Sequence, residues 1–413
     1  GNTGHYSALM RTEQAMTQLQ PLRRLALVAG ESSGDQIAAA VIAKLFQRAV
    51  PLEVRGVGGP SLVAAGMTCD VGIEALSLRG YVEVIRHLPR LLRLRKNLLK
   101  RFSRWPADIF LGVDAPDFNL QLAAMLKSRG IRSYHLVGPS IWAWRPERKW
   151  QIAKAVDHLL LLFPFEEALY RETGLATTYV GHPMADQISF NPDRIAARQA
   201  LGFDTDPNLK SIVEASDSDR WFCLLPGSRS DEIHQHAALM LEVAQQMALQ
   251  HPRALFLMPA ASPKLHTQLR DLIARHVHAA SKRIILYHGE ARRCIAACDQ
   301  VLAASGTVCL EAALIGRPMV IIYRMPALSY RWMRRLQLQP WVGLPNILAQ
   351  KFLVPELIQS QATVSAIIDA LDSQWENQAL LASLNNAFFA IHQSLRRDCA
   401  SRCAAVLEAA LVR

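Results

Sequence analysis

Short runs of apolar residues recur along this chain, and each run leads through a small or polar turn into a segment with helical periodicity. A short, continuous apolar run predicts a strand that is buried on both faces of a parallel sheet. The alternation of such strands with helices predicts a series of β–α units. The expected strands are 25–29, 52–57, 109–113, 134–137, 159–163, 222–225, 255–259, 284–287, 301–304 and 319–323.

The series of β–α units is interrupted once. Residues 190–220 are rich in Asp, Asn, Pro and Ser and have no period, which predicts a linker with a surface loop. We therefore expect an α/β protein with two Rossmann-like domains, 22–189 and 221–361, that face each other across a cleft. Residues 362–413 are expected to be helical. Residues 1–21 are polar and have no apolar signal-peptide core, so we expect a disordered leader there.

Length and composition agree with two globular domains and favour an anionic partner. The chain has 413 residues, and its formal net charge of +11 favours nucleic acid, an anionic lipid surface or a phosphorylated substrate. Its 7 cysteines include no CxxC pair, which indicates reduced, buried thiols rather than a metal site or disulfides. No apolar stretch approaches the roughly 20 residues that a membrane-spanning helix needs.

The first candidate for chemistry is the turn after the strand 301–304. Ser305, Gly306 and Thr307 lie between this strand and a helical segment, so backbone N–H groups and the positive end of a helix dipole are free to bind a phosphate. Glu311 lies one helical turn past Thr307 and could accept hydrogen bonds from both hydroxyls of a ribose. Together these residues predict a nucleoside diphosphate, although a purely structural βα corner has the same pattern.

Two more turns follow buried strands. Gly227, Ser228 and Arg229 follow the strand 222–225, and the guanidinium can neutralise a phosphate as a bidentate donor. The turn 30–35, GESSGD, is not a GxGxxG turn. No acidic residue follows the second strand at the position that binds the ribose of a dinucleotide. A dinucleotide cofactor is therefore not expected.

A carboxylate follows the strand 109–113. Asp114 is delivered to the carboxyl end of that strand, where doubly wound sheets bind ligands. In a cleft with little water, such a carboxylate has a raised pKa and can act as a general base. Asp117 and Asn119 are better explained as caps of the next helix. Pro116 keeps Asp114 outside that helix, so Asp114 is the candidate for chemistry.

A basic, amphipathic stretch lies in the first half of the chain. Residues 78–105 carry nine Lys or Arg and one acidic residue, with apolar side chains at helical spacing, and Pro89 is expected to start or kink a second helix. This pattern fits a helix on an anionic lipid surface, but a packing helix with a solvated basic face has it too. Residues 331–335, RWMRR, form a second basic and aromatic cluster. Nucleic acid is a weaker fit, because no known DNA-reading motif accompanies the charge.

These features predict a division of labour between the domains. Two phosphate-type turns place a nucleotide in the second domain, whereas the carboxylate and the basic surface place an acceptor in the first. This fits a nucleotide-sugar glycosyltransferase of the two-domain GT-B type. Helix N-termini and Arg229 would stabilise the leaving diphosphate, so no metal is expected. A carboxylate would remove the proton of the acceptor hydroxyl.

Several segments resemble the lipid-A-disaccharide synthase family, in that family's order. They are AGESSGD, GYVEVIRHLPRLL, GVDAPDFN, GPSIWAWRPER, PFE, VGHPMAD, LLPGSR, ASGTVCLEAAL and VGLPNILA, between residue 25 and about residue 357. The resemblance implies transfer of 2,3-diacylglucosamine from UDP-2,3-diacylglucosamine to 2,3-diacylglucosamine 1-phosphate, giving the β-1,6-linked disaccharide and UDP. It implies an inverting enzyme without metal or cofactor, attached peripherally to the cytoplasmic face of the inner membrane of Gram-negative bacteria.

The resemblance also implies roles for single residues. Asp114 is the candidate base, Arg229 lies near the donor diphosphate, and Asn346 belongs to an LPN turn near the cleft. Further substrate-binding residues are Ser33, Gly34, Gly227, Ser228, Ser305, Gly306, Thr307 and Glu311. Residues expected to meet the bilayer or acyl chains are Ile85, Leu88, Leu91, Leu92, Arg93, Trp332, Arg334 and Arg335. The C-terminal helices are expected to cross back to the first domain or to exchange between the subunits of a homodimer.

Three alternatives stay open at this point. Two are other GT-B-like enzymes, a peptidoglycan N-acetylglucosaminyltransferase and a UDP-N-acetylglucosamine 2-epimerase, and a water-soluble product would favour the epimerase. The third is a basic protein without catalysis that binds membranes or nucleic acid. Binding of RNA with a steep salt dependence and no binding of UDP would favour this third class.

Overall fold

The computed structural model describes residues 20–76, 81–138, 140, 142, 145–216, 220–277 and 280–413. Most of the expected leader, residues 1–19, lies outside the described residues. Among the helices of the described parts, none combines the length and hydrophobicity that crossing a bilayer requires. All seven cysteines are free, and six of them are buried, whereas Cys69 is half-buried.

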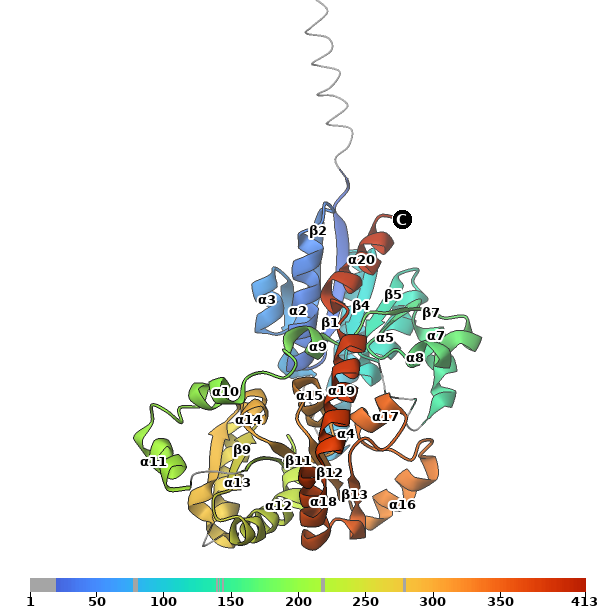
Figure 1. Ribbon diagram of the computed structural model, residues 1–413. Coiled ribbons are helices and arrows are strands. Elements are labelled where there is room, and N and C mark those ends of the chain that lie inside the picture. Colours follow the sequence, from blue (N-terminus) through green and yellow to red (C-terminus); the bar gives the residue numbers. More distant parts are fainter. Residues whose placement is uncertain are drawn as a thin grey trace, which may run out of the picture. The chain divides into compact units, whose positions relative to one another are not determined.

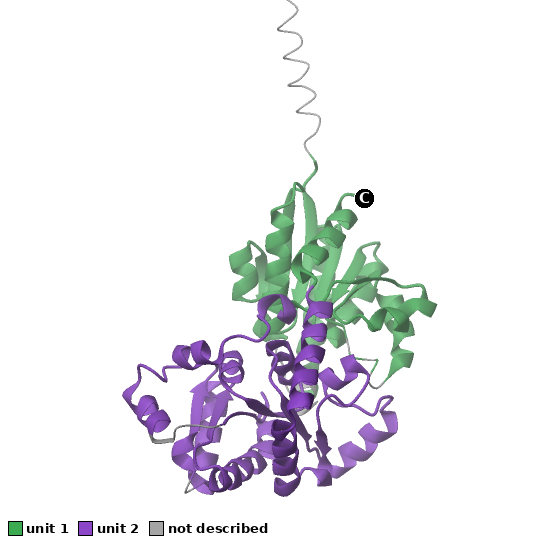
Figure 2. Cartoon of the chain, viewed as in Figure 1, with its two compact units in different colours: residues 1–183, 397–413 green, residues 184–396 purple. Residues whose placement is uncertain are grey.

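The chain folds into two compact units, which Figure 2 shows in green and purple. Unit 1 comprises the chain up to Pro183 together with Arg397–Arg413. Unit 2 comprises Met184–Arg396. The C-terminal stretch 362–413 is thereby divided between the two units.

The stretch 190–220, expected to be a linker, has regular structure in its described part. It contains the helices α10 (Arg194–Ala200) and α11 (Pro207–Ser216), and it belongs to unit 2. The side chain of Asp193 accepts a hydrogen bond from the Ile195 N–H at 2.9 Å and so caps α10. The polar residues that indicated a loop therefore serve in part as helix caps.

A parallel sheet forms the centre of unit 1 (Figure 1). In the described residues its seven strands follow the order β3-β2-β1-β4-β5-β6-β7. The strands are β1 (Arg23–Ala29), β2 (Leu52–Gly58), β3 (Thr68–Gly72), β4 (Ile109–Val113), β5 (Arg132–Leu136), β6 (His158–Leu161) and β7 (Ala176–Tyr179). Every pairing in this sheet is parallel.

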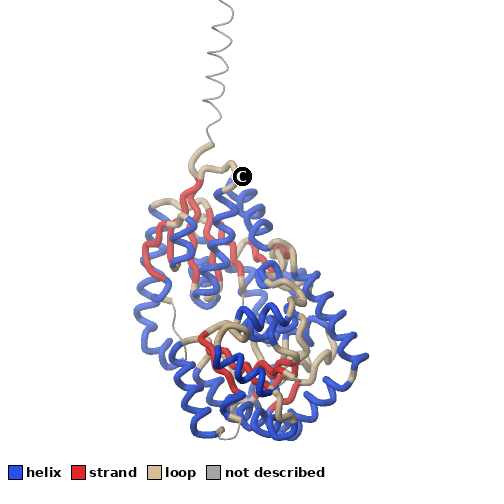
Figure 3. The backbone as a smooth tube through the Cα atoms, turned by 60° about the vertical axis from the view of Figure 1, so that its left-hand side comes forward, coloured by secondary structure: helices blue, strands red, loops and turns tan. Residues whose placement is uncertain are grey.

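Helices cover both faces of this sheet (Figure 3). One face of β1 packs into a core with α2 and α20, and the other packs into a core with α4, α5 and α7. The helices of unit 1 are α2 (Ser32–Phe46), α3 (Pro60–Ala65), α4 (Tyr81–Arg104), α5 (Pro116–Lys127), α7 (Lys149–Ala155), α8 (Glu166–Tyr170) and α20 (Cys399–Leu411). The ion pair of Arg48 with Glu408, at 2.8 Å, ties the C-terminal helix to the segment that follows α2. The expectation of a second helix starting at Pro89 is wrong, because α4 runs through Pro89 without a break.

Unit 2 repeats the architecture with six parallel strands in its described residues. Their order is β10-β9-β8-β11-β12-β13. The strands are β8 (Trp221–Leu225), β9 (Leu255–Ala260), β10 (Ile284–His288), β11 (Gln300–Ala304), β12 (Met319–Tyr323) and β13 (Glu356–Ile358). Its remaining helices are α12 (Ser230–Gln250), α13 (Pro263–His276), α14 (Ala291–Ala297), α15 (Thr307–Ile315), α16 (Ala327–Leu336), α17 (Leu344–Ala349), α18 (Val364–Glu376) and α19 (Gln378–Leu395). The short helix α9 (Pro183–Gln187) begins at the boundary between the units.

Each sheet has one point at which the strand order reverses. In unit 1 the reversal lies between β1 and β4, and in unit 2 it lies between β8 and β11. Helices that follow two such strands lie on opposite faces of the sheet, so the turns at the carboxyl ends of the strands border a crevice. Sequence elements expected to bind ligands follow all four of these strands.

The fold predicted from the apolar runs is confirmed. Each of the ten expected strands is present, whereas β3, β7 and β13 were missed. These three strands lie at sheet edges, where one side is exposed and no continuous apolar run is required.

Asp35 holds the start of α3 and is buried. Its carboxylate accepts hydrogen bonds from the N–H groups of Gly59 at 2.8 Å, Ser61 at 3.0 Å and Leu62 at 3.1 Å. The last acidic residue of the GESSGD turn therefore supplies the partners that free N–H groups at a helix start require.

We expect Asp35→Ala to lower the free energy of unfolding by about 2–3 kcal/mol, because three backbone donors lose a charged acceptor. Urea denaturation followed by circular dichroism measures the change. The matched control is Asp204→Ala, since Asp204 is exposed. Equal denaturation midpoints for the two variants would contradict this role of Asp35.

Candidate active site

The turn after β4 has an unusual backbone. Asp114 and Ala115 have φ angles of 60° and 40°, in the left-handed region that residues with side chains rarely adopt. Pro116 begins α5 directly after them. Gly30 makes room for this turn, because a Cβ atom at Gly30 would lie 2.2 Å from the Cβ of Ala115. The turns after β1 and β4 are therefore in direct contact.

Asn119 holds the turn after β4 through hydrogen bonds from the interior of unit 1. Its side chain is fully buried, and its Nδ2 donates to the carbonyls of Val28 at 3.1 Å and Asp114 at 2.8 Å. The expectation that Asp117 or Asn119 caps α5 is wrong, because Ala115 is the N-cap residue and no side chain caps it. Asn119 instead joins the ends of β1 and β4.

The carboxylate of Asp114 has the environment expected of a proton acceptor. Burial raises the pKa of Asp114, and the negative charge of Glu31 raises it further. A hydrogen bond from the Ala115 N–H lowers the pKa in part. Glu31 is a residue that the sequence analysis missed. Its position in the turn after the first strand, beside a strand-order reversal, is the signal that could have found it.

The start of α2 lies beside Asp114. A Cβ atom at Gly34 would lie 3.3 Å from the Cβ of Asp114, so Gly34 is buried against the candidate base. Ser33 is exposed in the first turn of the same helix. Glu31 occupies the N-cap position, but its side chain makes no capping hydrogen bond. Ser33 and Gly34, which the resemblance implied as substrate-binding residues, thus lie at the strand-order reversal of unit 1.

In unit 2, the turn after β8 leads into α12. Gly227 has a φ of 126°, and a Cβ atom there would clash with the side chain of Glu232. The Glu232 carboxylate accepts a hydrogen bond from the Ser228 N–H at 3.0 Å. Arg229 is the exposed N-cap residue of α12, and it makes no side-chain cap. Arg229 thus stands at the start of α12, where the positive end of the helix dipole lies.

The turn after β11 leaves a helix start open. Gly306 has a φ of 147° and is the N-cap residue of α15 without a side-chain cap, and a Cβ atom there would meet open space. Ser305 is half-buried, and Thr307 is exposed. Backbone N–H groups at such a helix start can bind an anion.

Glu311 forms an ion pair with Arg292, a residue that the sequence did not indicate. Its Oε2 lies 3.3 Å from the Nε of Arg292, and Arg292 also donates to Gln187 at 3.1 Å. Burial raises the pKa of Glu311, whereas Arg292 lowers it. The single carboxylate predicted from sequence is therefore one half of an ion pair.

Asn346 is fully buried and has bonds within the unit. Its Nδ2 donates to the Val354 carbonyl at 3.0 Å and to Glu356 at 2.9 Å, and its Oδ1 accepts from the Val354 N–H at 3.0 Å. Glu356 also accepts from the N–H groups of Val342 and Gly343. Asn346 thus ties α17 to the segment that follows it, and Glu356 holds the loop before α17.

Two helices carry the residues expected at a bilayer. On α4, Ile85, Leu88 and Leu92 are exposed at 52%, 45% and 42%, and Arg93 is exposed too. The C-terminal part of α4 is buried through other residues. On α16, Trp332 is 66% exposed, and Arg334 and Arg335 are exposed as well.

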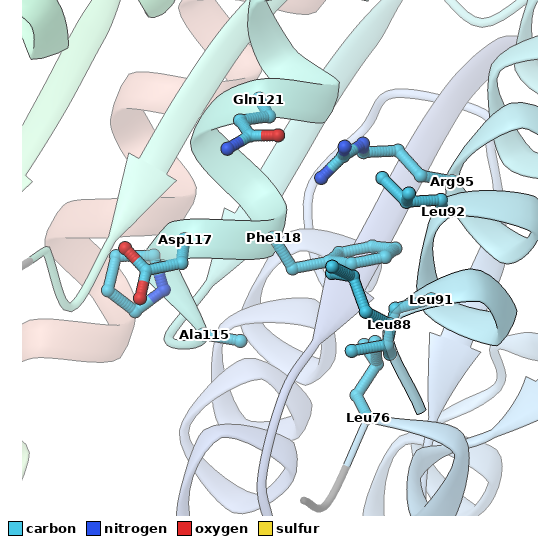
Figure 4. Close-up of a pocket in the computed structure, with 10 residues that line it drawn as sticks. Leu76, Leu88, Leu91, Leu92, Arg95, Ala115, Asp117, Phe118 and Gln121 are labelled. Carbon is cyan, nitrogen blue, oxygen red and sulfur yellow. The ribbon is translucent and has the colours of Figure 1, made fainter. Parts of the chain in front are cut away.

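A pocket of about 440 Å³ lies between α4 and the start of α5 in unit 1 (Figure 4). Leu88, Leu91 and Leu92 form one wall. Ala115 and Pro116, which directly follow Asp114, line it as well. The pocket therefore joins the apolar face of α4 to the turn of the candidate base.

Each unit thus has its own chemistry at its strand-order reversal. Unit 1 presents a carboxylate with a raised pKa beside an apolar pocket, which suits deprotonation of an amphiphilic acceptor. Unit 2 presents two helix starts without side-chain caps and one arginine, which suits a diphosphate. Among the described residues, no three His, Cys, Asp or Glu side chains are grouped so that they could hold a metal ion.

The sequence is similar to known proteins over nearly its whole length. A family profile described as lipid-A-disaccharide synthetase matches residues 25–405. The lipid-A-disaccharide synthase of Thiobacillus denitrificans is 44% identical, over 92% of this chain and 98% of that protein. The lipid-A-disaccharide synthase of Chromobacterium violaceum is 43% identical, over 94% of this chain and 97% of that protein.

Solved structures are similar in fold at low sequence identity. A putative UDP-N-acetylglucosamine 2-epimerase from Listeria monocytogenes matches with a TM-score of 0.59 at 12% identity, over 94% of this chain and 95% of that chain. A glycotransferase of kitacinnamycin matches with a TM-score of 0.58 at 14% identity, over 95% of this chain and 100% of that chain. These likenesses concern the fold alone and agree with two Rossmann-like units of the GT-B type.

We expect Asn119→Ala to lower the free energy of unfolding by about 2–3 kcal/mol, because two backbone carbonyls lose a buried donor. Urea denaturation provides the measurement. Asn208→Ala is the control, since Asn208 is exposed, and its effect should stay within about 0.5 kcal/mol. A midpoint for Asn119→Ala equal to that of the control would show that Asn119 does not hold the two strand ends.

Proposed function

Because the chain belongs to the lipid-A-disaccharide synthase family, we propose that it transfers 2,3-diacylglucosamine from UDP-2,3-diacylglucosamine to 2,3-diacylglucosamine 1-phosphate. Glycosyltransferase activity in lipid A biosynthesis follows from the family itself. Family membership also decides among the alternatives that the sequence left open, in favour of the transferase. The observation that carries the substrate assignment is the position of Asp114 at the strand-order reversal of unit 1, beside an apolar pocket.

The donor is assigned to unit 2. The diphosphate of the donor is bound at the starts of α12 and α15, with Arg229 as the counter-charge. The backbone donors are N–H groups of the turns 227–229 and 305–307 other than those of Ser228 and Ser305, which donate to Glu232 and Ile322. Arg292 bonds Oε2 of Glu311, and we assign the other carboxylate oxygen, Oε1, to the ribose hydroxyls. Asn346 acts through the loop that it holds.

The acceptor is assigned to unit 1. Its hydroxyl gives its proton to the Asp114 carboxylate while the hydroxyl oxygen attacks the anomeric carbon of the donor sugar. The bond from that carbon to the diphosphate breaks, and UDP leaves with the bonding electrons. One displacement inverts the configuration at the anomeric carbon. Helix starts and Arg229 stabilise the charge on the diphosphate, so the proposed step requires no metal.

The lipid substrates call for contact with a membrane. We assign this contact to α4, through Ile85, Leu88 and Leu92, and to α16, through Trp332 and its flanking arginines. Exposed apolar side chains next to arginines favour peripheral binding to an anionic surface. The proposed location is the cytoplasmic face of the inner membrane.

We expect Asp114→Asn to lower kcat by roughly 10²–10⁴-fold, because the amide cannot accept the acceptor proton. Its affinity for UDP should equal that of the unmodified protein, since unit 2 is unchanged. Formation of disaccharide phosphate from the two lipids measures kcat, and calorimetry measures binding of UDP. The control is Asp204→Asn at an exposed position. Near-normal turnover by Asp114→Asn would remove Asp114 as the base.

We expect Glu31→Gln to shift the acidic limb of the pH profile of kcat/KM to lower pH. Asp114 must be ionised to act as a base, and the charge of Glu31 raises the pKa of Asp114. Removal of that charge lowers the pKa, so the base stays ionised to a lower pH. An acidic limb that does not move would mean that Asp114 does not set it.

A further inference from the structure

Among the described residues that line the pocket beside the Asp114 turn, one is a cation. The walls of the pocket are mainly apolar and come from α4 and the start of α5, and Arg95 is the basic residue among its lining residues. Figure 4 shows the Arg95 guanidinium above the Phe118 ring, on the same side of the pocket as the amide of Gln121. The guanidinium carbon lies 5.9 Å from the centre of that ring.

Arg95 lacks an anionic partner in the part of the chain that the structure describes. No hydrogen bond or ion pair joins its side chain to another described residue, and its ring contact is with Phe118. Burial lowers the pKa of Arg95, which reports the loss of water around the guanidinium. Arg101 on the same helix, by contrast, is paired with Asp70 at 3.4 Å. A partly desolvated guanidinium without an anionic partner is available to bind an anionic ligand.

The acidic residue of the pocket does not supply that anion. Asp117 also lines the pocket, but Figure 4 shows its carboxylate on the opposite side of Phe118 from the Arg95 guanidinium. One oxygen of Asp117 lies 3.5 Å from Arg148. The start of α5 has no side-chain cap, so its dipole adds positive potential near Arg95.

We propose that this pocket binds the phosphate of the acceptor lipid together with one of its acyl chains, and that Arg95 is the phosphate ligand. The inference rests on the proposed function, in which the acceptor is an acylated glucosamine 1-phosphate. Such a molecule carries apolar chains and one dianion, and the pocket matches it with leucines and one guanidinium. A bilayer phospholipid has the same combination. We assign the acceptor because Ala115 and Pro116, next to the candidate base, line the pocket.

The test compares two ligands in detergent micelles, 2,3-diacylglucosamine 1-phosphate and 2,3-diacylglucosamine. The unmodified protein should bind the phosphorylated lipid at least about 10-fold more tightly, as expected for a charge-assisted bidentate contact. Arg95→Met should remove this preference, and Arg95→Lys should retain part of it. In the transfer assay, Arg95→Met should raise KM for the acceptor about 10-fold and leave kcat and KM for the donor near their original values.

Arg129→Met is the matched control, because it removes the same charge from an exposed position beyond the C-terminal end of α5. It should keep the preference for the phosphorylated lipid. If Arg95→Met also keeps that preference, the proposal is wrong. If Arg95→Met loses only its binding to phosphatidylglycerol vesicles, the phosphate belongs to the bilayer and the proposal is again wrong. If the unmodified protein prefers the phosphorylated lipid but catalyses no sugar transfer, the proposed function is wrong and the phosphate site at Arg95 stands.

Discussion

The hydrogen bonds from Asn119 to the carbonyls of Val28 and Asp114 link the carboxyl ends of β1 and β4, the two paired strands at which the sheet of unit 1 reverses its order. The candidate base depends on this contact, because a left-handed backbone at two successive residues with side chains is unfavourable and persists only where surrounding contacts enforce it. Gly30 leaves space for the turn at Ala115, and Asn119 donates the hydrogen bonds that hold this turn. Asp114 is thereby held at the carboxyl end of β4, outside the helix α5 that follows.

Unit 2 also has candidate binding turns at its strand-order reversal, but they present helix starts instead of a carboxylate. The turns after β8 and β11 lead into helices whose N-cap residues make no side-chain cap. The N–H groups of Ser228 and Ser305 already donate to Glu232 and Ile322, so we assign the ligand to the other N–H groups at these two helix starts. One sheet therefore presents a proton acceptor at its reversal and the other presents positive potential. In the proposed reaction these are the two complementary requirements: the nucleophile loses a proton, and the leaving group gains negative charge.

The fold could be predicted from sequence because it depends on local patterns. Nine of the ten predicted strands lie inside a sheet, and most of the ten are short apolar runs, whereas the missed strands β3, β7 and β13 are short and lie at sheet edges. Asp114 was found because a strand directly precedes it. Asn119 was misread as a helix cap because one of its two partners, Val28, lies 91 positions away in sequence. The pairing of Glu311 with Arg292 spans 19 positions and the bond of Asn346 to Val354 spans 8, and neither separation lies within one turn of a helix. Contacts between distant segments carry no local signal.

The most direct test of this account is release of UDP from UDP-2,3-diacylglucosamine in detergent and a metal chelator, with and without 2,3-diacylglucosamine 1-phosphate. The account predicts that UDP and a disaccharide phosphate appear together, and only when both lipids are present. Release of UDP without the acceptor would contradict it, because no acceptor hydroxyl would then be attacking the sugar. Loss of all release in the chelator would contradict the assignment of leaving-group stabilisation to helix starts and Arg229.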